Sequence, residues 1–141
     1  NYRLLDRNAV IAEEIFSQLK SNGIKIALNT GFTKVITDTI LARLHWNNGA
    51  TKIDFVISSD EVPEGRPCPF MIETIMRQLN INDPHQVVKV GDTEVDILEG
   101  RNADCGLVVS VTTGAYTREQ LQQYNPDHII DSLSELPSLI L

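Results

Sequence analysis

The sequence of 141 residues predicts an α/β fold, with a doubly wound parallel sheet that carries helices on both faces. Three observations support this class. Short apolar runs of strand length recur along the chain, helical patterns of apolar residues separate them, and small polar residues follow most of the runs. Because parallel neighbours need a crossover connection, usually a helix, the prediction is a Rossmann-like core.

The first half of the chain is expected to alternate between helix and strand. Apolar residues between Val10 and Leu19 form one stripe of a helix, and Asn22-Gly23 is a typical helix end. A buried strand is predicted over 24–28. Thr33 or a neighbour then begins a helix, whose inward stripe is Val35, Ile36, Ile40, Leu41 and Leu44.

The second half continues the same alternation. Strands are predicted at 55–57, 87–90, 107–111 and 128–130, and helices at 70–79, 93–99, near 118–123 and from Leu133 onward. In such sheets ligands bind beyond the carboxyl ends of the strands. The loops directly after the strands are therefore where functional side chains are expected.

Composition excludes several classes of partner. The formal net charge is −7, and no run of Lys or Arg exceeds one residue, so we expect no nucleic-acid or membrane partner. No apolar stretch approaches the roughly 20 residues of a membrane span. The two isolated cysteines, Cys68 and Cys105, are typical of a reducing compartment, and we expect a cytoplasmic location.

Two carboxylates follow the strand at 87–90. Asp92 comes directly after Gly91, and Asp96 lies four residues on, one turn along the next helix and on the same face. Converging carboxylates suit a hard cation such as Mg²⁺. The alternative is that Asp92 only caps the helix and Asp96 is solvated.

Two further segments could bind phosphate. Asn29, Thr30 and Gly31 follow the first strand and offer donors at a helix start, although they could form a helix cap only. Arg66 lies on a stiff segment before a helix, where it could reach the same edge or remain a surface cation. Lys89 lies one residue inside an apolar strand, where an inward lysine would need a carboxylate or phosphate nearby; the alternative is that it extends to solvent.

In chain order these segments resemble motifs two, three and four of the haloacid dehalogenase superfamily of phosphohydrolases. The motifs are Asn29-Thr30-Gly31, Gly65-Arg66-Pro67 before a helix, and Lys89-Val-Gly-Asp92-x-x-x-Asp96. The run over 91–103 and the later Thr113-Gly114-Ala115 are similar to the phosphonatase-like branch, which includes phosphonoacetaldehyde hydrolase.

The resemblance implies a role for each motif. Asp92 would ligate Mg²⁺ and Asp96 would support the metal from the next turn. Arg66 would be the catalytic cation that balances charge on the nucleophile and the phosphoryl group. Asn29 and Thr30 would contact the phosphoryl oxygens, with Gly31 completing the phosphate site, and which of the two makes the main contact stays open.

The superfamily's nucleophile is not found in this sequence. That nucleophile is an Asp in an Asp-x-Asp or Asp-x-Ala pattern, and no Asp here has Asp or Ala two residues later. Residues 1–21 are similar to the helix that leads from the cap domain into the core, and 22–141 to the core itself. We therefore expect a carboxy-terminal part that lacks motif one and the cap and is inactive alone. The missing cap could also form a homodimer contact.

Three functions compete at this point. The first is part of a Mg²⁺-dependent hydrolase that acts on a small phosphate monoester or a phosphonate through an aspartyl-phosphate. The second is a non-catalytic or regulatory module that binds phosphate and metal. The third, a receiver domain, ranks low because Leu28 is followed by Asn29-Thr30-Gly31 and not by an acidic pair.

Overall fold

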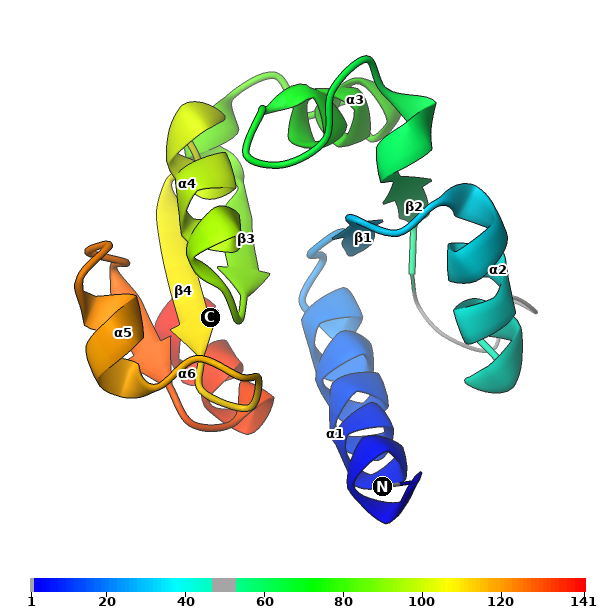
Figure 1. Cartoon of the computed structure of the whole chain (residues 1–141), viewed down its shortest axis with the longest axis vertical. Helices are drawn as coiled ribbons and strands as arrows, with labels where there is room; N and C mark the ends of the chain where they lie inside the picture. The colour runs from blue at the N-terminus through cyan, green and yellow to red at the C-terminus, as the bar shows by residue number, and fades with distance from the viewer. Residues whose placement is uncertain (1, 47–52) are drawn as a thin grey trace.

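The computed structural model describes residues 2–46 and 53–141, with side chains from residue 11 onward. Its elements alternate along the chain as the periodicity predicts (Figure 1). The helices are α1 (Tyr2–Ser21), α2 (Lys34–Arg43), α3 (Phe70–Gln78), α4 (Glu94–Asn102), α5 (Arg118–Gln122) and α6 (Leu136–Ile140). The strands are β1 (Ala27–Thr30), β2 (Phe55–Ser58), β3 (Val88–Gly91), β4 (Leu107–Val111) and β5 (His128–Ile130).

All strand pairs of the described chain are parallel, but they form two sheets and not one. One sheet has the order β1-β2 and the other the order β3-β4-β5. Within the described residues, β1 and β3 each keep one edge without a strand partner, and the two edges belong to different sheets. The predicted parallel α/β class is therefore confirmed, and in the described residues its strands are divided between two sheets.

The first strand is shifted relative to the prediction. It begins at Ala27, not at residue 24, and runs through Thr30, so Asn29 and Thr30 are its last residues and not part of the following loop. Pairing decides this boundary, because the register with β2 extends from Ala27–Phe55 to Thr30–Ser58. Just before the strand, the Ile26 amide donates to the Asp54 carboxylate at 2.7 Å and is held outside the ladder.

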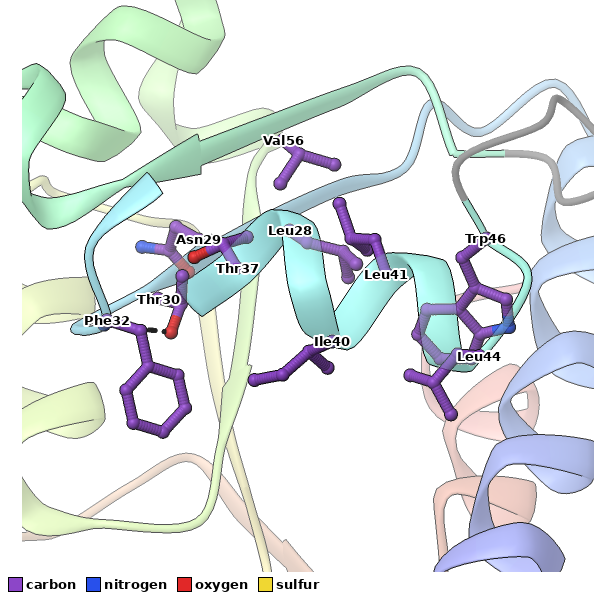
Figure 2. Close-up of a pocket in the computed structure, with 10 residues that line it drawn as sticks. All are labelled: Leu28, Asn29, Thr30, Phe32, Thr37, Ile40, Leu41, Leu44, Trp46 and Val56. Carbon is purple, nitrogen blue, oxygen red and sulfur yellow. Dashed lines mark hydrogen bonds between the residues drawn. The ribbon is translucent and has the colours of Figure 1, made fainter. Parts of the chain in front are cut away.

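Helix α2 and the strands β1 and β2 enclose an apolar hollow of about 230 Å³ (Figure 2). Leu28, Leu41 and Val56 line it together with Trp46. The predicted inward stripe of this helix is only partly correct, because Val35, Ile36 and Ile40 are exposed. The buried residue of α2 is the polar Thr37, whose hydroxyl lies 2.9 Å from that of Ser58.

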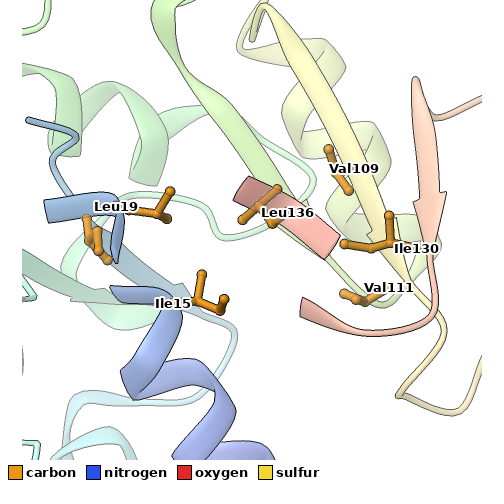
Figure 3. Close-up of a cluster of buried hydrophobic side chains, with 7 residues drawn as sticks. Ile15, Leu19, Val109, Val111, Ile130 and Leu136 are labelled. Carbon is orange, nitrogen blue, oxygen red and sulfur yellow. The ribbon is translucent and has the colours of Figure 1, made fainter. Parts of the chain in front are cut away.

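The larger sheet is covered on both faces, as predicted. Val109 and Val111 of β4 point toward α1 and α6, where they pack with Ile15 and Leu136 (Figure 3). Val108 points the other way because side chains alternate along a strand. On that face it packs in a second apolar cluster with residues of α3, α4 and α5, namely Ile72, Ile97 and Leu121. None of the described helices has the length and apolar character needed to cross a membrane.

Candidate phosphate and metal site

The carboxyl ends of β1 and β3 bring together most of the residues predicted for the site. Arg66 Nη1 donates to Asp96 Oδ1 at 2.7 Å, and its Nη2 lies against Gly31, where an added Cβ would be 2.7 Å away. Arg66 therefore reaches the end of β1 from the segment before α3, as the sequence predicts. It is not a solvated surface cation, because its side chain is 26% exposed.

Helix α4 begins beside these residues with a capping box. Thr93 is its N-cap, and the Thr93 hydroxyl accepts from the Asp96 amide while the Asp96 carboxylate accepts from the Thr93 amide. Thus Asp92 is not the helix cap that the simpler alternative proposed. Asp96 is 5% exposed, so it is not solvated either.

Both oxygens of Asp96 are already occupied. Oδ2 accepts from the Asp92 amide, the Thr93 amide and the Thr93 hydroxyl, and Oδ1 accepts from Arg66. Burial alone would raise the pKa of Asp96, but Lys89 and Arg66, helped by the Thr93 hydroxyl, outweigh it and hold the pKa below its ordinary value. Asp96 is therefore an ionised carboxylate that organises the site.

Lys89 is buried and meets the partners that an inward lysine needs. Its Nζ lies 2.9 Å from Asn29 Oδ1, 3.0 Å from Glu99 Oε1 and 3.4 Å from Asp96 Oδ1. Glu99 is fully buried, and the sequence analysis missed it. The signal was available, because Glu99 lies three residues after Asp96 and therefore on the same side of α4.

Asp92 is the carboxylate of the pair that is free to take a ligand. Among the described residues no hydrogen bond is made to its side chain, which lies against Gly114 in the loop after β4. An added Cβ at Gly114 would come within 2.1 Å of Asp92 Oδ2, so the glycine makes room for this carboxylate. The described residues contain no group of three or more His, Cys, Asp or Glu side chains arranged for a metal. One free carboxylate still suits Mg²⁺, which keeps several waters and takes oxygens from a bound phosphate.

Thr30 lies at the end of β1 and makes a local contact. Its Oγ1 accepts from the Phe32 amide at 3.1 Å, which leaves the hydroxyl hydrogen available to a ligand (Figure 2). The neighbouring Asn29 is committed differently, because its amide donates to Glu99 Oε2 at 2.8 Å and accepts from Lys89. The side chain of Asn29 is thus held by two charged partners, whereas the Thr30 hydroxyl makes only a local contact.

Comparison with known proteins gives consistent results. Residues 6–104 match the sequence profile of the haloacid dehalogenase-like hydrolases. A phosphonoacetaldehyde hydrolase of Latilactobacillus sakei is 34% identical over an alignment that covers 90% of this chain and 56% of the relative. A phosphonoacetaldehyde hydrolase of Bacillus cytotoxicus is 31% identical over 91% of this chain and 56% of its own length.

A solved structure shares the fold. The crystal structure of a phosphonoacetaldehyde hydrolase-like protein from Oleispira antarctica superposes with a TM-score of 0.76 at 24% identity, over 91% of this chain and 54% of that one. The chain thus spans about half the length of the relatives it matches.

Proposed function

This chain belongs to the haloacid dehalogenase-like hydrolase family, and from that premise we propose that it forms part of a Mg²⁺-dependent hydrolase of phosphate monoesters or phosphonates. The reaction passes through an aspartyl-phosphate. The observation that carries the proposal is that Arg66 links the carboxyl ends of β1 and β3. It lies against Gly31, next to Thr30, and it donates to Asp96, whose carboxylate also accepts from the Asp92 amide. Ligands of open α/β sheets bind at such an edge.

The residues of this chain supply charge and positioning. Arg66 uses Nη1 for its hydrogen bond to Asp96. Its remaining N–H groups beside Gly31 donate to the oxygens of the transferring phosphoryl group. The Thr30 hydroxyl donates from the end of β1. Mg²⁺ on Asp92 would neutralise charge on the phosphoryl oxygens when bound. Phosphoryl transfer depends mainly on such positioning and electrostatic stabilisation.

The nucleophile belongs to a strand outside the described residues. We place that strand beside β1 and β3, because each has an edge without a strand partner in the described chain. A carboxylate at its carboxyl end would bond to phosphorus as the leaving group departs with the bonding electron pair. Water would then cleave the aspartyl-phosphate and release inorganic phosphate. The 141 residues alone are therefore expected to show no turnover.

The test compares this chain with the protein translated from its whole coding sequence. Phosphate release is measured with Mg²⁺ from p-nitrophenyl phosphate and from phosphonoacetaldehyde. We expect turnover by the whole protein, loss of turnover in Asp92→Asn, and none with residues 1–141. Turnover by residues 1–141 that disappears in Asp92→Asn would refute our placement of the nucleophile.

The two substrates also distinguish a phosphonate hydrolase from a phosphatase. Faster release from phosphonoacetaldehyde would assign the phosphonate reaction, which is the activity named for the Latilactobacillus sakei relative. Faster release from the ester would assign a phosphatase. Calorimetric binding of Mg²⁺ and phosphate by the whole protein without turnover would instead favour the non-catalytic module.

A further inference from the structure

A buried ion pair connects the two sheets behind the proposed phosphate site. Lys89 on β3 and Glu99 on α4 have side-chain exposures of 8% and 0%, and Lys89 Nζ lies 3.0 Å from Glu99 Oε1. The contact is an ion pair, and Glu99 Oε1 has no hydrogen-bond partner among the described residues. Asn29 on β1 is the side chain that both partners contact across the gap between the sheets.

The chemistry of this pair fixes the orientation of the Asn29 amide. A lysine ammonium can only donate, and an ionised carboxylate can only accept. Asn29 Oδ1 therefore faces Lys89 at 2.9 Å, and Nδ2 faces Glu99 Oε2 at 2.8 Å. The reversed amide would set oxygen against carboxylate and N–H against ammonium, which would cost two partly buried hydrogen bonds.

The orientation of the Asn29 amide affects the proposed phosphate site because Asn29 precedes Thr30 at the end of β1. In the observed orientation, the acceptor of Asn29 is covered by Lys89, and one Nδ2 hydrogen remains after the bond to Glu99. The strand end thus presents N–H and O–H donors and no uncovered side-chain amide oxygen. An anion is attracted to such an edge, whereas an exposed carbonyl oxygen would repel it.

Lys89 also acts on the other half of the site. Its Nζ lies 3.4 Å from Asp96 Oδ1, the oxygen that accepts from Arg66. Glu99 in turn balances the charge of Lys89, so the ammonium shares Asp96 without displacing Arg66. The same ion pair therefore holds Asn29 on one side and the Asp96–Arg66 pair on the other.

We infer that Lys89 and Glu99 are positioning residues that hold Asn29, Asp96 and Arg66 in the arrangement that binds a phosphoryl group. This inference rests on the phosphate site of the proposed function. Neither residue needs to touch the phosphate, because each acts through a neighbour.

The test uses the protein translated from the whole coding sequence, and it has two readouts. The first is the pair of Asn29 side-chain amide signals in ¹H–¹⁵N spectra, and the second is the affinity for inorganic phosphate with Mg²⁺ by calorimetry. The main variant is Lys89→Met with Glu99→Gln, which removes both charges and keeps the side-chain sizes. Lys20→Met, which removes a partly exposed ion pair with Asp54 on the surface, is the matched control.

In the double variant we expect the Asn29 side-chain amide protons to exchange with water faster than in the wild type, and phosphate to bind about tenfold more weakly. The Lys20→Met control should keep both wild-type values. Unchanged Asn29 signals and unchanged phosphate affinity in the folded double variant would overturn the inference. If that variant does not fold, the isosteric Glu99→Gln decides alone, because its amide must set a donor against either Lys89 or Asn29.

The two readouts separate this inference from the proposed function. If the wild-type whole protein binds no phosphate but the variants show the expected change in the Asn29 signals, the phosphate site is refuted and the holding of Asn29 is supported. If the wild-type protein binds phosphate but Glu99→Gln changes neither readout, the phosphate site is supported and the positioning role of Lys89 and Glu99 is refuted.

Discussion

Replacing Asp96 with alanine is expected to lower the free energy of unfolding by about 3–5 kcal/mol, the usual cost of removing one partner of a buried ion pair. Asp96 is 5% exposed and lies 2.7 Å from Arg66 and 3.4 Å from Lys89. Its loss leaves Lys89 buried with one carboxylate fewer and removes the acceptor that completes the Thr93 capping box.

Urea unfolding followed by circular dichroism measures this cost. With a slope of about 2 kcal/mol per molar urea, the midpoint should fall by about 1.5–2.5 M. Asp38→Ala is the control, because Asp38 pairs with Lys34 at 3.7 Å and both side chains are 60% exposed. Its effect should stay below about 0.5 kcal/mol. An Asp96→Ala midpoint within about 0.3 M of that control would refute our view of Asp96 as the organiser of the site.

Three further predictions use other features of the structure. Gly114→Ala should weaken Mg²⁺ binding in calorimetry and cost about 1–3 kcal/mol in urea unfolding, because the new Cβ would displace the Asp92 carboxylate; an unchanged affinity and midpoint would contradict this. The folded pKa values of Asp54 and Asp96 lie below 3.8, so the stability that these carboxylates contribute is present above that pH and is lost as the pH falls from 3.8 toward the folded values. Thermal melts from pH 6 to pH 2 should show this loss as a fall in Tm, and a Tm that does not change with pH would exclude it. Burial raises the pKa of Cys105 to about 11, so iodoacetamide at pH 8 should label this thiol only after unfolding, as mass spectrometry would show.

Local patterns were sufficient to predict the order of the elements and several of the site residues. The glycine and the acidic spacing after the strand at 87–90 pointed to Asp92 and Asp96, and the stiff segment before a helix pointed to Arg66. The contacts of Arg66 with Asp96 and Gly31 confirm that it reaches this edge. The metal role of Asp92 stays a prediction.

Tertiary pairing decided what the sequence could not. Nothing local to Asn29 indicates that its amide is committed to Lys89 and Glu99, which come from other elements 60 and 70 residues away. The start of the first strand moved to Ala27 because pairing with β2 fixed the register. The exposure of Val35 on α2 also escaped prediction, because periodicity identifies an apolar stripe but not whether another element covers it.

The central place of β4 has a consequence for how the molecule opens. This strand is paired on both edges, and its residues Val108 and Val109, each 1% exposed, belong to the apolar clusters on opposite faces. In the described chain β1 is paired only with β2. Backbone amides of β4 should therefore exchange with solvent deuterium only through global unfolding, while those of β1 exchange through a smaller opening. The proposed site is therefore expected to lie between β1, which opens easily, and the loop after β4, where Gly114 lies against Asp92.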